Sequence, residues 1–182
     1  MLACGDFEGT RKKYTHMMDF LRFLEQSSFS QWVIGSSSVF AFPTVLLLHT
    51  IGMGIVVGIN AGIGLRILGL APALPLAPMD RFFPLLWIGF WVNAITGVIL
   101  LIADATTKVT NPDFYIKMIF IALAVVIMQA IRKRVLRDPF VDKKPVSSDV
   151  KVLAVTSLLC WLGAITAGRL LAYIGPVSGL TK

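Results

Sequence analysis

Residues 82–103 read FFPLLWIGFWVNAITGVILLIA, a run without a single charged side chain. A helix needs about 20 predominantly apolar residues to cross a hydrocarbon core of about 30 Å. The run meets that length, and it is continuously apolar, whereas the strands of a membrane β-barrel alternate apolar and polar residues. This segment therefore predicts a transmembrane helix.

Three further stretches resemble it. Residues 38–65 and 152–168 carry no charge, and residues 118–131 extend back to Tyr115 if the Lys117 ammonium reaches the membrane interface. With their flanks, the stretches predict an all-α polytopic membrane protein, a bundle of four transmembrane helices. The expected spans are about 38–68, 82–105, 112–134 and 149–173.

The composition of the 182-residue chain agrees with a membrane environment. Hydrophobic residues make up 56% and charged residues 15%, against about 25% charged residues in typical soluble domains. The same values exclude a disordered chain, which would be polar and highly charged. Two cysteines, Cys4 and Cys160, exclude a disulfide scaffold, and no C-x-x-C pair indicates zinc.

Helix boundaries are marked by proline and by capping residues. Asn111-Pro112 places an N-cap residue before a first-turn proline, which predicts the start of the third span. Residues 147–149 offer caps for the fourth span. The proline-rich residues 71–78 cannot continue a helix. Pro43 is expected to kink or restart the first span, which would begin with a half-buried turn at about residues 32–38.

An amphipathic helix is predicted before the bundle, over residues 14–26. Its apolar side chains recur at helical spacing, at Met17, Phe20, Leu21 and Leu24. Such a helix either lies in the headgroup plane or packs on a partner subunit. No cleavable signal peptide is expected.

The chain accordingly divides into three parts. Residues 1–30 form the tail and the interfacial helix, and residues 31–175 form the transmembrane domain. Gly175-Pro176 is expected to close the last helix, which leaves residues 176–182 as a C-terminal tail.

Basic residues predict the orientation. Seven of them lie in residues 132–151, and Arg66 and Arg81 lie in the first loop, at the same end of a four-span bundle. The positive-inside rule places this end in the cytoplasm and both termini on the periplasmic side of a bacterial inner membrane. Residues 11–13 argue the other way, but they lie far from the first span. The positive charge is thus a topology signal, and nucleic acid is not an expected partner.

His49 is the one histidine inside a predicted span. An imidazole at membrane depth is costly unless it bonds a partner or a metal. It is therefore a candidate axial ligand of haem b, or a histidine that hydrogen-bonds across helices. Met53 is a candidate second ligand. A bis-histidine haem within this chain lacks a second imidazole, because His16 lies outside the spans, so a haem would be shared with a partner chain.

Small residues in the first span predict close helix packing. Gly54, Gly58 and Gly62 recur at four-residue spacing, which lets another backbone approach or leaves room for a flat cofactor or quinone. Asn60 and Asn93 are expected to hydrogen-bond between helices.

Arg169 and Tyr173 lie four residues apart near the end of the fourth span. Arg169 either snorkels to the interface or binds an acidic headgroup, a quinone carbonyl or a haem propionate. Pairing with Asp104, at the same end of the second span, is a further alternative. Arg169 and Tyr173 are therefore candidate cofactor contacts.

Several segments resemble an uncharacterised family of bacterial four-helix inner-membrane proteins. They are His49-Thr50-Ile51-Gly52 with Gly58, and residues 65–70, 111–117 and 161–173. Gly64 stands where that family usually has an aspartate. More distantly, the layout is similar to copper-resistance D and cytochrome b membrane domains. The resemblance implies the four-helix fold and redox, haem or copper chemistry, although the additional histidines of those relatives are absent.

These observations predict an integral membrane subunit of a redox or energy-converting assembly without self-contained catalysis. It would contact lipid and other membrane subunits, or copies of itself, and would hold a haem, pigment or quinone near His49 and Arg169. The alternatives are a small copper transporter or copper-handling protein that uses His49 and Met53, and an assembly factor without a ligand.

Overall fold

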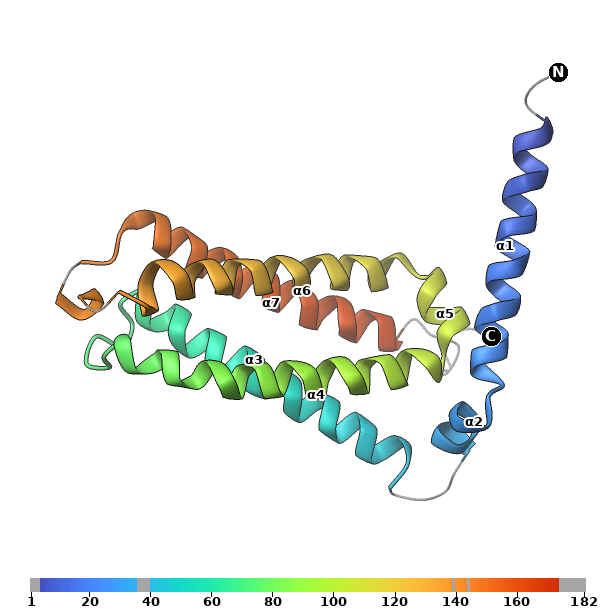
Figure 1. Ribbon diagram of the computed structural model, residues 1–182, viewed down its shortest axis with the longest axis horizontal. Coiled ribbons are helices and arrows are strands. Elements are labelled where there is room, and N and C mark those ends of the chain that lie inside the picture. The colour runs from blue at the N-terminus through green and yellow to red at the C-terminus, as the bar shows by residue number, and fades with distance from the viewer. Residues whose placement is uncertain (1–3, 36–39, 139, 144, 174–182) are drawn as a thin grey trace.

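The computed structural model describes residues 4–35, 40–138, 140–143 and 145–173, and this part of the chain contains helices and no strand. Four long helices lie side by side, while α1 runs across one end of them (Figure 1). The elements are α1 (Cys4–Glu25), α2 (Ser28–Gly35), α3 (Phe42–Ile67), η1 (Ala77–Phe82), α4 (Phe83–Ile102), α5 (Ala105–Thr110), α6 (Pro112–Ile131), η2 (Arg132–Leu136), η3 (Val141–Lys143) and α7 (Ser148–Tyr173).

The four predicted spans are confirmed as helices long and apolar enough to cross a membrane, which makes the protein a multi-pass membrane bundle. Many large apolar side chains of these helices face outward, and an apolar surface of this extent is unfavourable in water. Leu47, Ile95, Val126 and Leu162 are each about 60% exposed, at 59%, 59%, 66% and 61%. Lipid is the solvent that such an exterior fits.

Helix boundaries follow the proline and capping signals closely. The first span begins at Phe42 with Pro43 in its first turn, so Pro43 restarts a helix after the separate helix α2. Residues 36–39, where the span was expected to begin, lie outside the described residues, as do residues 174–182 with Gly175-Pro176. The side chain of Asn111 caps α6 as predicted, accepting a hydrogen bond from the Asp113 amide at 2.9 Å.

The second and third spans end differently from the prediction. The second ends at Ile102 rather than 105, because the chain turns at Ala103 and Asp104 and then forms the short helix α5. The third leaves α-helical geometry after Ile131 and continues as the π-helical turn η2 to Leu136.

Two helical hairpins build the bundle, α3 with α4 and α6 with α7, and α3 joins them by packing on α7. The shared core includes Ile63 and Ile67 of α3, Met128 and Ile131 of α6, and Ala154 of α7. All are at most 4% exposed.

Hydrogen bonds of charged side chains hold the loops together at one end of the bundle, where the α3–α4 and α6–α7 connections meet (Figure 1). Arg132 binds Asp80 through two hydrogen bonds of 2.7 and 3.2 Å. Asp142 accepts from the backbone amides of Leu76 and Ala77 at 2.7 and 3.2 Å. The connector that contains the prolines is thus held against the basic loop.

The opposite end is closed by α1. The Glu25 carboxylate accepts hydrogen bonds from the Thr106 amide and hydroxyl at 2.6 and 2.7 Å, so α1 supplies a charge at the N-terminus of α5. The predicted apolar face of α1 is only partly covered by the bundle. Leu21 is buried, whereas Met17 and Phe20 are 39% and 60% exposed.

Candidate functional site

His49 of α3 points at α4 and forms a reciprocal pair with Asn93. Its Nδ1 lies 3.0 Å from the Asn93 backbone carbonyl and 3.1 Å from the Thr96 hydroxyl. In return, the Asn93 side-chain amide donates to the His49 backbone carbonyl at 2.8 Å. The interhelical bonding expected for Asn93, and for His49 in one of its two interpretations, is therefore present.

The partner of Nδ1 fixes the state of the imidazole. A carbonyl oxygen only accepts, so Nδ1 carries the proton in this bond. The Thr96 hydroxyl donates to the Val92 carbonyl at 2.6 Å and accepts from Nδ1. In the neutral ring the lone pair is then on Nε2, the arrangement found in metal-ligating histidines. Nε2 has no hydrogen bond to any residue that the structure describes.

Gly97 makes room for this ring. A Cβ at Gly97 would lie 3.2 Å from Cε1 of His49, tighter than most real contacts of this kind. The imidazole thus lies over a glycine of α4, one turn beyond Asn93. His49 itself is only partly buried.

Lys117 of α6 lies against α7, in the part of the bundle where α6 begins and α7 ends. Its Nζ lies 3.5 Å from the position that a Cβ on Gly168 would take, so the side chain runs over α7. Among the described residues, Lys117 has no hydrogen bond or ion pair. It is close enough to His49 for electrostatic interaction. A cation on a membrane-spanning helix without a partner among the described residues marks a candidate functional position.

Lys108 of α5 adds a second cation near His49 and Lys117. Its Nζ donates to the Leu100 carbonyl at 2.6 Å, which caps the end of α4. Burial lowers the pKa of the Lys108 ammonium, and the carboxylate of Asp104 partly opposes this effect. His49, Asn93, Thr96, Lys108 and Lys117 together are called the His49 site below.

The other predicted contacts are dispersed around this site. Met53 lies one helical turn beyond His49 and is partly buried. Arg169 is exposed on α7, next to the glycine that Lys117 covers. No ion pair joins Arg169 to Asp104 within the described part of the chain. Tyr173 ends α7, and its side chain lies outside what the structure describes.

The predicted glycine ridge faces away from the bundle. A Cβ added at Gly54, Gly58 or Gly62 would meet no atom of the described residues within 4 Å, so these glycines make no close packing with that part of the chain. Helix α3 approaches α4 closely on its opposite face instead. A Cβ at Gly52 would lie 2.8 Å from the Gly89 carbonyl oxygen, and one at Gly89 would lie 2.8 Å from Ile55.

Asn60 confirms the second interhelical prediction. Its amide donates to the Ser157 hydroxyl of α7 at 3.0 Å, and that hydroxyl lies 3.2 Å from the amide oxygen of Asn60. Both residues are at most 1% exposed. This bond joins the two hairpins near the middle of the bundle.

A metal site made by protein ligands alone finds no support. The described residues contain no group of three or more His, Cys, Asp or Glu side chains that could hold an ion. Cys160 is buried, as expected for an inert thiol.

Sequence reasoning missed Thr96, Lys108 and the contact of Lys117 with Gly168. The spacing of Asn93 and Thr96, three residues apart on one face of α4, was the available signal. Comparisons with family models, with curated proteins and with solved structures found no match to this chain.

Proposed function

We propose that this protein is a membrane subunit of a redox assembly that holds haem b at the His49 site. The observation that carries the proposal is the bond from Nδ1 of His49 to the Asn93 carbonyl, 3.0 Å long. It orients the ring and leaves the Nε2 lone pair for a metal, as outer-shell partners do for other ligating histidines.

The positive charges around His49 favour the binding of a negatively charged ligand. Haem carries two propionates, and Lys108 and Lys117 are the cations nearest to His49. Lys117 has no anionic partner among the described residues, so a propionate would supply the charge that this ammonium lacks. Bound haem would supply one-electron transfer, while the chain's own residues bind and orient it.

A single histidine within the bundle favours a second chain. Bis-histidine haem needs another imidazole, and His16, on helix α1 outside the four spans, is the other histidine of the sequence. We infer that a partner subunit or a second copy completes the site. The chain would lie in a bacterial inner membrane, with the basic loops in the cytoplasm.

The test is purification in mild detergent from haem-replete bacterial cells, with the pigment quantified by its pyridine complex. The wild-type protein should show a Soret band, and His49→Ala should lose at least about ten-fold in haem content, because it removes the ligand. Thr50→Ala is the matched control, since the Thr50 hydroxyl bonds only to its own helix at Leu46.

Two results would overturn the haem proposal. One is a colourless protein purified in complex with its membrane partners, and the other is a His49→Ala variant that keeps its haem. The subunit part is tested separately by the mass of the intact detergent complex. A strict monomer without further chains would count against it.

A further inference from the structure

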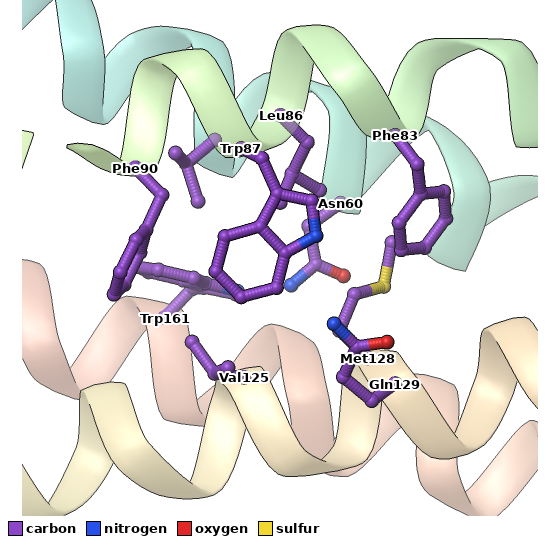
Figure 2. A pocket seen from close by; sticks show the side chains of 10 residues that line it. Asn60, Phe83, Leu86, Trp87, Phe90, Val125, Met128, Gln129 and Trp161 are labelled. Atoms are coloured by element: carbon purple, nitrogen blue, oxygen red, sulfur yellow. The ribbon is translucent and has the colours of Figure 1, made fainter. Parts of the chain in front are cut away.

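Helix α1 carries apolar side chains that the bundle leaves uncovered. Leu21 is 7% exposed, whereas Met17, one turn earlier on the same face, is 39% exposed, and Phe20 is 60% exposed. Inside the bundle, apolar side chains cover one another. Figure 2 shows side chains of α4, α6 and α7 that meet there, among them Leu86 and Met128, which are 6% and 4% exposed. The free part of the α1 face has no such cover from the described residues.

The direction of α1 limits what can cover this face. Figure 1 shows α1 running crosswise over the end of the bundle, with its N-terminal part reaching past the bundle's edge. Transmembrane helices tilt by about 20° on average from the membrane normal. A helix that lies crosswise to four such spans therefore runs roughly along the membrane surface.

The depth of α1 follows from the length of α4. The 20 residues of Phe83–Ile102 form a helix about 30 Å long, which matches the hydrocarbon core of a bilayer. Helix α5 begins at Ala105, directly after α4, and so lies at the level of the lipid headgroups. The Glu25 carboxylate of α1 accepts two hydrogen bonds from Thr106 of α5, at 2.6 and 2.7 Å. These bonds hold α1 at the same level.

Exposed aromatic side chains mark this level independently. Tyr115, near the start of α6, is 52% exposed, and its hydroxyl donates to the Val109 carbonyl at 3.0 Å. Trp32 of α2, the helix that follows α1, is 54% exposed. Tyrosine and tryptophan are enriched where the membrane meets water, because their rings are apolar and their N–H or O–H groups are polar.

The side of α1 that faces the bundle also faces the membrane. Leu21 and Glu25, one turn apart, both contact the bundle end, so Met17, one turn further back, points the same way. Asp19 and Phe23 lie on the far side of the helix. Phe23 is exposed there, and single exposed apolar side chains are ordinary on surfaces that face water.

We propose that α1 binds the phospholipid surface, with its axis along the membrane plane and with Met17 and Phe20 among the headgroups and upper acyl chains. Interfacial helices bury their apolar face about 5–10 Å into this layer. Exposed Arg11 and Arg22 lie on one flank of that face, where they would reach lipid phosphates. The proposal rests on the four spans crossing the membrane, and it does not rest on haem at His49.

The experiment uses the full chain in phosphatidylcholine nanodiscs, in a Cys4→Ser and Cys160→Ala background. A cysteine-reactive fluorophore is attached to Met17→Cys or to Asp19→Cys, the matched control on the opposite side of α1. Lipids brominated in their upper acyl chains should quench the label at position 17 at least about three-fold more strongly than the label at position 19. Aqueous iodide should quench them in the reverse order.

A second measurement needs neither labels nor cysteine substitutions. Replacing both Met17 and Phe20 by serine leaves the buried core intact, since both side chains are exposed. It should increase amide hydrogen exchange over residues 11–20 in nanodiscs at least about ten-fold, because the lipid contact that holds α1 is lost. Replacing exposed His16 and Asp19 by serine is the control and should leave this exchange unchanged.

Equal quenching of the two labels by brominated lipid would overturn the proposal. A label at position 17 that is shielded from iodide and from brominated lipid alike would assign this face of α1 to another protein chain, which also overturns it. Unchanged exchange in the variant without Met17 and Phe20 would show that these side chains do not hold α1 on the membrane.

Discussion

The side chain of His49 donates to the backbone of Asn93, and the side chain of Asn93 donates to the backbone of His49, at 3.0 and 2.8 Å. Two hydrogen bonds therefore join the residues across the interface of α3 and α4. In lipid, where polar groups find few alternative partners, such a pair both orients the imidazole and fixes the register of the hairpin.

Asn93→Ala should weaken this hairpin. The variant loses the bond to the His49 carbonyl, and interhelical hydrogen bonds in membranes contribute about 0.5–2 kcal/mol. We expect a decrease of that size in the free energy of unfolding, measured in detergent with increasing dodecyl sulfate. Thr156→Ala is the control, because the Thr156 hydroxyl bonds only to Val152 of its own helix. Equal stability of the two variants would contradict the structural role of the pair.

Gly52 and Gly54 provide a sharper test of which face of α3 is packed. Alanine at Gly52 would place its Cβ 2.8 Å from the Gly89 carbonyl oxygen and 2.9 Å from the Asn93 nitrogen, and these backbone atoms cannot turn away. Overpacking of this kind costs about 1–3 kcal/mol. Gly52→Ala should therefore lower the unfolding temperature clearly.

Gly54→Ala is the matched control on the same helix. Its Cβ meets no atom within 4 Å, so the variant should be as stable as wild type. A loss of stability in Gly54→Ala, or none in Gly52→Ala, would show that the packed face is assigned wrongly. Dissociation of a larger complex by Gly54→Ala, with the single chain intact, would support the predicted contact of the glycine ridge with a partner.

The glycines also show which feature of the fold could not be predicted from the sequence, namely the face of each helix that is packed. The existence of each span depends on its apolar length, a property that can be read residue by residue, and Asn111 and Pro43 mark helix starts through local chemistry. Which side of a span faces inward depends on contrast between its faces. α3 is apolar on every side, so its spacing pattern suggested Gly54 and Gly58 although Gly52 makes the contact.

The candidate site was likewise only partly predictable from the sequence. His49 and Asn93 are polar groups in apolar spans, so each had to find a partner, and hydrogen bonds between helices were expected. That the two are each other's partners depends on the crossing of α3 and α4. Lys117 was expected to reach the interface, and its contact with Gly168 of α7 depends on the packing of α6 on α7, which the sequence does not show.

The orientation of the bundle gives a prediction that is independent of any ligand. In a background with Cys4→Ser and Cys160→Ala, single cysteines replace exposed Ser148 at the basic end or exposed Thr110 at the α5 end. A membrane-impermeant maleimide should label Thr110→Cys in intact bacterial cells, and Ser148→Cys only after the membrane is opened. The positive-inside rule requires this pattern. The reverse pattern would place the basic loops outside.

Lys117→Leu should stabilise the ligand-free protein. The ammonium lies beside Gly168 of α7 with no hydrogen bond or ion pair to the described residues, and a desolvated, unpaired charge is unfavourable. Replacing it with a shorter, apolar side chain should raise the free energy of unfolding by at least about 1 kcal/mol. Lys151→Leu, at an exposed position in the first turn of α7, should change it by less than about 0.5 kcal/mol.

The Lys117→Leu variant also distinguishes a ligand-binding role of Lys117 from a structural role. If its charge serves an acidic ligand at the His49 site, Lys117→Leu should gain stability and lose haem, whereas Lys117→Arg should keep the haem because it keeps the charge. A destabilised Lys117→Leu would mean that the ammonium already has a favourable partner in the folded protein. In that case the unneutralised charge next to His49, and the case for a propionate there, would both be lost.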